Sequence, residues 1–222
     1  MIDVYYLWND REWSPGKRIS LAARLSENMQ ERANRFRRWQ DAQAYIAGKL
    51  LLARLFHIPS RELTLSYTAN SRPFIRGACD FNISHSGALV VIAVGGAGRI
   101  GIDIESEGDI DLSIYQRLFS TEEWNQIVGA GSGMARRFYE SWTQKEAVLK
   151  ADGCGLIHPM NEVRLCHRSA WFNQAWWNLS KLDIAAGYAC HLAMEILQPV
   201  GLPQDLSFAL DLYEHEATKY AN

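Results

Sequence analysis

The stretch FNISHSGALVVIAVGGAGRIGIDIE, residues 81–105, carries the strongest fold signal in the chain. β-Branched residues dominate it, and Gly95, Gly96 and Gly98 interrupt them. Because β-branched residues favour strands and glycines favour turns, the stretch predicts two strands joined by a glycine-rich turn. A seam near residues 95–101 would divide the chain into two comparable halves.

Gly96, Gly98 and Gly101 also form a GxGxxG pattern. A dinucleotide-binding fingerprint needs a helix directly after the glycines, so that the pyrophosphate meets the helix N-terminus. The residues that follow here, IGIDIE, have a strand pattern instead. We therefore reject a dinucleotide site.

Strand alternation in GIDIE places Asp103 and Glu105 on one face and the isoleucines on the other. Neighbouring carboxylates raise each other's pKa unless a cation lies between them, so the pair suits a hard ion such as Mg²⁺. Charged residues also protect exposed strand edges. The pair alone leaves both interpretations open.

Helical patterns lie on both sides of this stretch. Apolar residues recur at spacings of three and four within residues 20–56. STEEWNQIVG, residues 120–129, predicts a short helix capped by Ser120, and a longer helix is expected from Ala135 to about Lys150, ending at Asp152-Gly153. Strand-like pieces follow at 175–184 and 187–197.

The longer helix contains FYESWTQKEAVLK, residues 138–150, in which Trp142, Glu146 and Lys150 are four residues apart. This spacing puts them on one helix face. Glu146 would add a third oxygen ligand if that face packs against Asp103. Alone, the spacing fits equally a surface Glu-Lys pair, which contributes only a few tenths of a kcal/mol.

Composition excludes several classes of protein. The chain has 222 residues, 48% of them hydrophobic and 22% charged, which is typical of a globular domain. A net charge of −2 argues against a general nucleic-acid binder, which needs a positive excess. No signal peptide or membrane-spanning run is present in the sequence, so we expect a cytoplasmic protein. The four cysteines lack disulfide or zinc spacing.

The ordered set FNISHSG, GIDIE and FYESWTQKEAVLK closely resembles the Sfp-type 4′-phosphopantetheinyl transferases, of the holo-acyl-carrier-protein synthase superfamily. The family pattern W-x-x-K-E-x-x-x-K matches Trp142, Lys145, Glu146 and Lys150. Each motif alone is weak, whereas the set in this order and spacing is specific. The resemblance covers about residues 32–156.

The resemblance implies an α/β (α+β) fold of two similar, pseudo-twofold-related halves, here 1–100 and 101–222, with the active site in the cleft between them. Such enzymes transfer 4′-phosphopantetheine from coenzyme A to a serine of an apo acyl, peptidyl or aryl carrier protein. They require Mg²⁺ and release 3′,5′-ADP. We expect a monomer whose partners are coenzyme A and a carrier protein, and no nucleic acid or membrane.

Site residues follow from the same resemblance. Asp103, Glu105 and Glu146 would hold the metal, Glu146 would act as general base, and Lys150 would stabilise the departing phosphate. The coenzyme A contacts implied are Arg32, Arg72, Asn82, Ser84, His85, Asp103, Lys145 and Lys150. Arg35 is a weaker candidate for the 3′-phosphate.

The chain departs from the family at two places. Ser71-Arg72-Pro73 replaces the usual Gly-Lys-Pro. The glycine is lost, and the positive charge lies on a planar guanidinium group instead of a lysine ammonium group. Some members have an arginine at the position of Ala44, so that contact is expected to be missing.

Other features allow more than one interpretation. Glu123 aligns with an acidic residue near the metal in some members, and it also completes a capping box with Ser120, which we favour. We expect Trp171, Trp176 and Trp177 in the core, and residues 110–124 are a candidate carrier surface. The alternative functions are a non-catalytic coenzyme A or carrier-binding module and another Mg²⁺-dependent diphosphate-cleaving enzyme.

Overall fold

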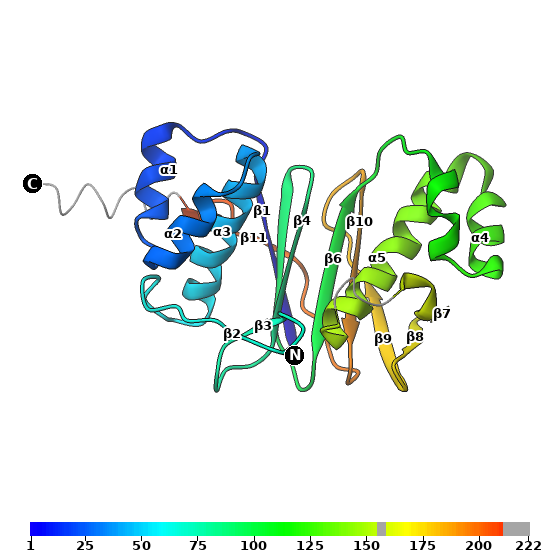
Figure 1. The fold of residues 1–222 in the computed structure, drawn as a ribbon. Coiled ribbons are helices and arrows are strands. Elements are labelled where there is room, and N and C mark those ends of the chain that lie inside the picture. Colours follow the sequence, from blue (N-terminus) through cyan, green and yellow to red (C-terminus); the bar gives the residue numbers. More distant parts are fainter. Residues whose placement is uncertain (155–158, 211–222) are drawn as a thin grey trace, which may run out of the picture.

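The computed structural model describes residues 1–154 and 159–210 (Figure 1). The elements before the seam are β1 (Ile2–Trp8), α1 (Pro15–Ala22), α2 (Glu27–Asn34), α3 (Trp39–Leu55), β2 (Ser66–Tyr67), β3 (Pro73–Phe74), β4 (Phe81–Ser86) and β5 (Leu89–Gly95). Those after it are β6 (Ile100–Ser106), η1 (Leu112–Leu118), α4 (Thr121–Val128), η2 (Gly131–Gly133), α5 (Met134–Asp152), η4 (Met160–Glu162), β7 (Arg164–Cys166), β8 (Ser169–Phe172), β9 (Ala175–Lys181), β10 (Tyr188–Met194) and β11 (Gln204–Asp205).

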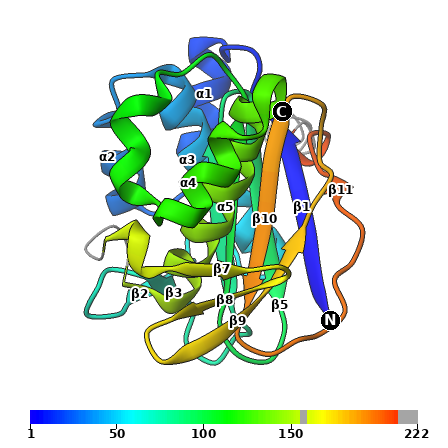
Figure 2. The ribbon, with the colours of Figure 1, turned by 90° about the vertical axis from the view of Figure 1, so that its right-hand side faces the viewer.

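Two sheets pack against each other, and helices cover their outer faces (Figures 1 and 2). Strand orders are β11-β1-β5-β4 and β6-β10-β9-β8-β7. The core between the sheets takes alternate residues of β5 and of β6, which is the edge strand of the second sheet. They are Leu89, Val91 and Ala93 from β5 and Ile100, Ile102 and Ile104 from β6. The other face of β5 packs against α3. The predicted α/β class with two halves is thus confirmed.

Gly101 lets α5 lie directly on β6. It faces away from the isoleucines, and a Cβ at this position would overlap the carbonyl oxygen of Ala147 and the amide nitrogen of Ala151. Both belong to α5, so backbone rather than a movable side chain fills the space. Without a side chain at Gly101, the helix approaches closely enough for its polar face to meet Asp103.

Residues 81–105 form three strands, so the two-strand prediction was wrong. β4 and β5 make a hairpin through the two-residue turn Gly87-Ala88, in which Gly87 has φ +55°. This turn is not evident from the sequence, because the polar residues of FNISHS belong to one face of β4. The glycine-rich turn does connect β5 to β6, with φ +86° at Gly96, but these strands join different sheets. The strand predicted after the glycines is present as β6, so no helix begins at this turn.

The helix predictions agree with the structure in most places. Residues 20–56 are helical but broken into the end of α1, α2 and α3. Ser120 caps α4, and α5 ends at Gly153, whose φ is +87°. Trp177 is buried as expected, but Trp176 is 55% exposed, because successive residues of β9 face opposite sides of the sheet.

The end of the described chain returns to the first half. β11 pairs in parallel with β1, and Ala209 and Leu210 lie in the core beside α3. Among residues 1–154 and 159–210, no helix is long and apolar enough to cross a membrane.

We expect Gly101→Ala to lower the free energy of unfolding by about 3 kcal/mol, since the new methyl group must displace the backbone of α5. Chemical denaturation measures this loss. Gly16→Ala is the matched control, because nothing lies within 4 Å of a Cβ there. Equal stability of Gly101→Ala and wild type would contradict the close helix–strand approach.

Candidate active site at the junction of β4 and β6

Side chains of β4 and the residue before it cap the free backbone edge of β6, so the two sheets meet without a continuous ladder. Oxygen atoms of alternate residues accept hydrogen bonds from β6 amides. The pairs are Asp80 with Ile100 (2.8 Å), Asn82 with Ile102 (3.1 Å) and Ser86 with Ser106 (3.1 Å). Because side chains are longer than a backbone contact, this junction leaves room for further polar groups between the strands.

Asp103 lies within this junction and is only 3% exposed. Its Oδ1 accepts hydrogen bonds from Ser84 Oγ (2.9 Å) and Lys150 Nζ (2.5 Å). Its Oδ2 is buried and has no hydrogen-bond partner in the structure as described. The alternative of an exposed, charge-protected edge is therefore wrong for Asp103. A buried carboxylate oxygen without a partner is costly, which suggests a ligand at this point.

Glu105 and Glu146 stand beside Asp103, and burial raises the pKa of both. The pKa of Glu146 rises to about 7, with Asp103 and Glu105 adding to the effect of burial and Lys150 opposing it. Burial also raises the pKa of Glu105, against the hydrogen bond that Ser86 Oγ donates to its Oε2 (2.6 Å). The three carboxylates are thus electrostatically coupled.

Lys150 bridges α5 and the strand junction. Its Nζ donates to Ser84 Oγ (2.7 Å) and to the carbonyl oxygen of Ile102 (3.3 Å), as well as to Asp103. The structure thus places Ser84, Asp103 and Lys150 in one cluster. The surface-pair interpretation of the FYESWTQKEAVLK helix does not hold, since Lys150 points into the junction.

The carboxylates meet some requirements of a magnesium site. In the part of the chain that the structure describes, no three His, Cys, Asp or Glu side chains form a ready-made metal cluster. Magnesium ions commonly use only one or two carboxylates and complete their shell with water and phosphate oxygens. The free Oδ2 of Asp103 and the raised pKa values of Glu105 and Glu146 fit such an open site.

A pocket of about 300 Å³ opens next to this cluster, between the two halves. Lys49, Asn82 and Lys150 contribute to its lining. Burial, together with the charge of Arg32, lowers the pKa of Lys49 to about 8. Lys49 was not among the residues predicted from the sequence, although a lysine that interrupts the apolar run of α3 is a detectable signal.

Tyr45 connects this pocket to a groove of about 710 Å³ on the first half, which Arg32 and Tyr67 also line. Lys49 Nζ lies 5.4 Å from the centroid of the Tyr45 ring, and Arg32 Cζ lies 5.5 Å from it. His85, near the end of β4, has its pKa lowered by burial, with Asp41 acting in the opposite direction. Cations thus extend from Lys150 to Arg32.

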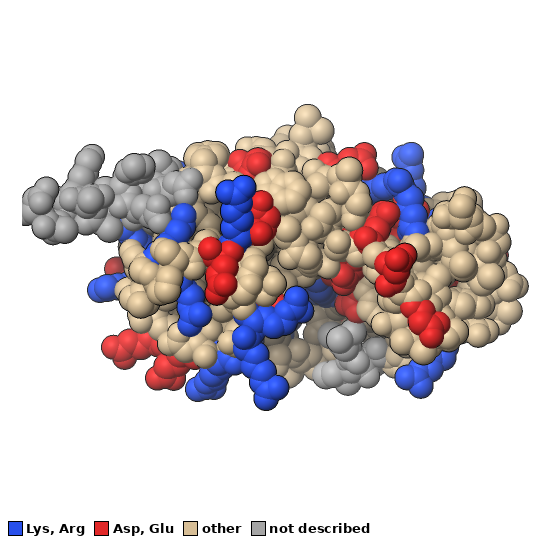
Figure 3. Space-filling view, turned by 90° about the horizontal axis from the view of Figure 1, so that it is seen from above, with Lys and Arg blue, Asp and Glu red and all other residues tan. Residues whose placement is uncertain are grey.

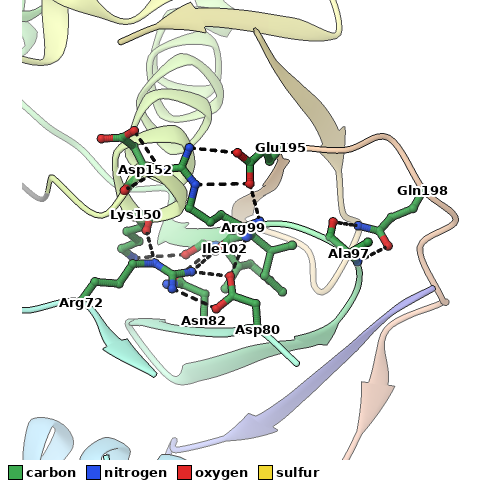
Figure 4. Close-up of polar contacts among 11 residues, drawn as sticks. Arg72, Asp80, Asn82, Ala97, Arg99, Ile102, Lys150, Asp152, Glu195 and Gln198 are labelled. Atoms are coloured by element: carbon green, nitrogen blue, oxygen red, sulfur yellow. Dashed lines mark hydrogen bonds and ion pairs between the residues drawn. The ribbon is translucent and has the colours of Figure 1, made fainter. Parts of the chain in front are cut away.

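Arg72 is largely enclosed, with 9% of its side chain exposed. Its guanidinium makes a two-pronged contact with Asp80 (2.9 and 2.6 Å) and donates to the carbonyl oxygens of Lys150 (3.0 Å) and Ile100 (2.8 Å) (Figure 4). Ser71 has φ +65°, so it keeps the left-handed backbone that a glycine adopts easily. Most donors of the predicted coenzyme A ligand therefore already have protein partners.

The side chain of Lys145 points away from Asp103, Glu105 and Glu146. It is fully buried, and its Nζ contacts Glu123 Oε2 (2.9 Å) and donates to the carbonyl oxygen of Val163 (2.6 Å). Glu123 completes the capping box with Ser120 at the start of α4, as favoured above. The coenzyme A contact predicted for Lys145 does not fit this environment, because the ammonium group is enclosed.

Positive charge gathers beside the junction. Arg35, Arg37 and Arg38 connect α2 to α3 and are exposed. The view from above shows Lys and Arg side chains next to the hollow between the halves, on the side of the first half (Figure 3). Such a surface attracts anions despite the negative total charge.

Fold and site together define a two-half α/β protein with a buried carboxylate–lysine cluster beside a cationic pocket. The family model described as "4′-phosphopantetheinyl transferase, N-terminal" matches residues 11–96, and that of the 4′-phosphopantetheinyl transferase superfamily matches residues 99–193. The chain belongs to this superfamily.

Relatives agree with this assignment. 4′-Phosphopantetheinyl transferase Sfp of Bacillus subtilis is 30% identical, over 73% of this chain and 76% of its own length. The transferase psf-1 of Bacillus pumilus is 33% identical over 58% of each chain. L-aminoadipate-semialdehyde dehydrogenase-phosphopantetheinyl transferase of Xenopus laevis is 30% identical, over 70% of this chain and 59% of its own length. The chain therefore matches less than two thirds of the last two.

We expect Glu146→Gln to stabilise the metal-free protein at pH 8 by about 1–3 kcal/mol. A pKa near 7 in the folded state lies above that of an unfolded glutamate, so wild-type stability falls as pH rises from about 4.5 to 7. Denaturation with chelator at several pH values measures this slope. Added Mg²⁺ should raise the melting temperature of wild type more than that of the variant.

Glu140→Gln is the matched control, because Glu140 lies on the same helix but pairs with Lys181 at 2.7 Å. This variant should show no gain in stability at pH 8. Parallel pH profiles of wild type and Glu146→Gln would contradict a coupled, buried Glu146.

Proposed function

We propose that this chain transfers the 4′-phosphopantetheine group of coenzyme A to a serine of an apo carrier protein, with Mg²⁺, and releases 3′,5′-ADP. One observation carries most weight. A buried aspartate, Asp103, keeps an oxygen without a partner beside Lys150, in a chain of the phosphopantetheinyl transferase superfamily. The relatives psf-1 and Sfp are both named 4′-phosphopantetheinyl transferases, which supports the same activity for this chain.

Asp103, Glu105 and Glu146 would hold the metal, with Asp103 Oδ2 as the most available oxygen. When bound, Mg²⁺ would neutralise negative charge on the pyrophosphate of coenzyme A. Phosphoryl transfer depends mainly on such positioning and charge neutralisation. Lys150 would add a positive charge on the same side, facing the phosphate that leaves.

Glu146 would act as the general base. Its pKa of about 7 applies to the metal-free site. A bound cation would lower this pKa, so that Glu146 would be unprotonated near neutral pH and able to accept a proton. The carrier serine loses its proton to Glu146, directly or through a water, and its oxygen forms a bond to the phosphorus that bears the pantetheine. The bond from that phosphorus to the bridging oxygen breaks, and 3′,5′-ADP leaves with this oxygen.

Coenzyme A would lie along the cations between the halves. The pyrophosphate would occupy the pocket at Lys150, Asn82 and Lys49, and the nucleotide would extend past Tyr45 toward Arg32. His85 would approach the nucleotide from the end of β4. Ala44 cannot bind an anion as the arginine of some family members would, and Lys49 would supply such a contact instead.

Further proposals concern organisation and partners. The halves 1–100 and 101–222 would act together as a monomer. The two family models, which meet between residues 96 and 99, support the boundary near residue 100, whereas β11, near the end of the described chain, pairs with β1 of the first half. The exposed Arg35, Arg37 and Arg38 suit an acidic carrier protein, with residues 110–124 on the opposite side as a candidate surface. We also propose a cytoplasmic location for this protein.

We expect a mass increase of one phosphopantetheine group on an apo carrier protein incubated with this chain, coenzyme A and Mg²⁺. Glu146→Gln should reduce the rate at least about a hundredfold, since proton transfer contributes that much. Intact-mass spectrometry measures both. Coenzyme A hydrolysis without an adduct would favour a diphosphate-cleaving enzyme, and binding alone would favour a non-catalytic module.

We expect Lys49→Met to weaken coenzyme A binding by about tenfold or more, because a charge-assisted contact to phosphate is lost. Isothermal titration in the presence of Mg²⁺ measures the affinity. Arg54→Met, an exposed position on the same helix, is the control and should bind like wild type. Unchanged affinity in Lys49→Met would remove this residue from the site.

A further inference from the structure

Two arginines hold the last turn of α5, which carries Lys150 (Figure 4). Arg99 lies directly before β6, the strand on which the helix packs, and its Nη1 donates to the carbonyl oxygen of Asp152 (3.1 Å). Arg72 comes from the other half, and its Nε donates to the carbonyl oxygen of Lys150 (3.0 Å). The Arg72 contact therefore fixes the helix end relative to the opposite half.

The Arg72–Asp80 pair also holds β6. Arg72 Nη2 donates to the carbonyl oxygen of Ile100 (2.8 Å), and Asp80 Oδ2 accepts from the amide of the same residue (2.8 Å). Both ends of this residue's backbone are thus bound by one ion pair. The pair is mostly enclosed, with 9% and 15% of the two side chains exposed, so it is shielded from the solvent that weakens surface pairs.

The surrounding backbone accommodates an arginine at this position. Gly153, which ends α5, has φ +87°, and a Cβ there would lie 2.8 Å from Arg72 Cδ. A single lysine nitrogen cannot reproduce a two-pronged contact with Asp80 together with bonds to two carbonyl groups. The arginine that replaces the usual family lysine thus makes contacts that lysine could not make.

The consequence for the site concerns Lys150. Its carbonyl oxygen is held by Arg72, while its Nζ reaches Ser84 and Asp103. We propose that Arg72 and Asp80 are positioning residues, which fix Lys150 and the end of α5 against β6, and that Arg72 is not a phosphate ligand. This inference rests on the proposed transferase function, in which Lys150 faces the leaving phosphate.

Steady-state kinetics separates the two roles of Arg72. Arg72→Lys, which restores the usual family residue, should lower kcat about tenfold or more through misplacement of Lys150. KM for coenzyme A should change less than about threefold, because no ligand contact is lost. Asp80→Asn should show the same changes in kcat and KM. The kcat of the double variant should be only slightly lower than that of either single variant. Arg76→Lys, an exposed position that follows β3 while Arg72 precedes it, is the control.

Hydrogen exchange supplies a readout that does not need activity. Peptides covering residues 146–153 should exchange faster in Arg72→Lys and Asp80→Asn than in wild type and Arg76→Lys. If wild type transfers nothing, the proposed function fails, while this measurement still decides whether Arg72 holds the helix end. Titration with coenzyme A, which should leave the affinity of both variants close to wild type, completes the test.

Opposite results would overturn the inference. A raised KM or a weakened affinity in Arg72→Lys, with unchanged kcat and exchange, would make Arg72 a ligand. Unchanged kcat in Asp80→Asn would contradict positioning through the pair. Should Arg72→Lys fail to fold, Asp80→Asn keeps the arginine and carries the same kinetic and exchange comparison.

Discussion

The capping of the β6 edge by polar side chains of the β4 segment is the constraint on which the site depends. Backbone amides at a strand edge need partners, and here Asp80, Asn82 and Ser86 supply them. A backbone ladder would draw the sheets together and fill the space between them. Side-chain capping satisfies the same amides and leaves a polar junction, in which Asp103 is buried but not fully bonded.

The charged side chains at this junction come from two elements that pack against each other, β6 and α5. β6 brings Asp103 and Glu105, α5 brings Glu146 and Lys150, and Gly101 lets the helix approach. Burial and mutual repulsion favour protonated carboxylates until a cation arrives. A magnesium–diphosphate ligand would supply both the missing cation and an anion for the lysines. Such a site is costly when empty, and part of the binding energy would offset that cost.

The sequence predicted which charged side chains meet at the site better than it predicted the contact partners of the surrounding residues. Alternation in GIDIE and the four-residue spacing in α5 placed Asp103 and Glu146 correctly on polar faces, because both follow from local geometry. Long-range contacts were not predictable. Lys145 matched a family position by residue type and Arg72 by its charge alone, yet their partners, Glu123 and Asp80, depend on packing between distant segments. Lys49 belongs to no family motif that the sequence analysis used, and only the folded chain places it in the pocket with Lys150.

The central claim is that the β4–β6 junction holds the diphosphate of coenzyme A. A crystal structure with coenzyme A and Mg²⁺ tests it most directly. The account predicts the pyrophosphate between the halves, with Lys150 and Lys49 in contact and an ion on Asp103 Oδ2. A pyrophosphate bound in the groove at Arg32 and Tyr67, with Asp103 Oδ2 still without a partner, would contradict the account.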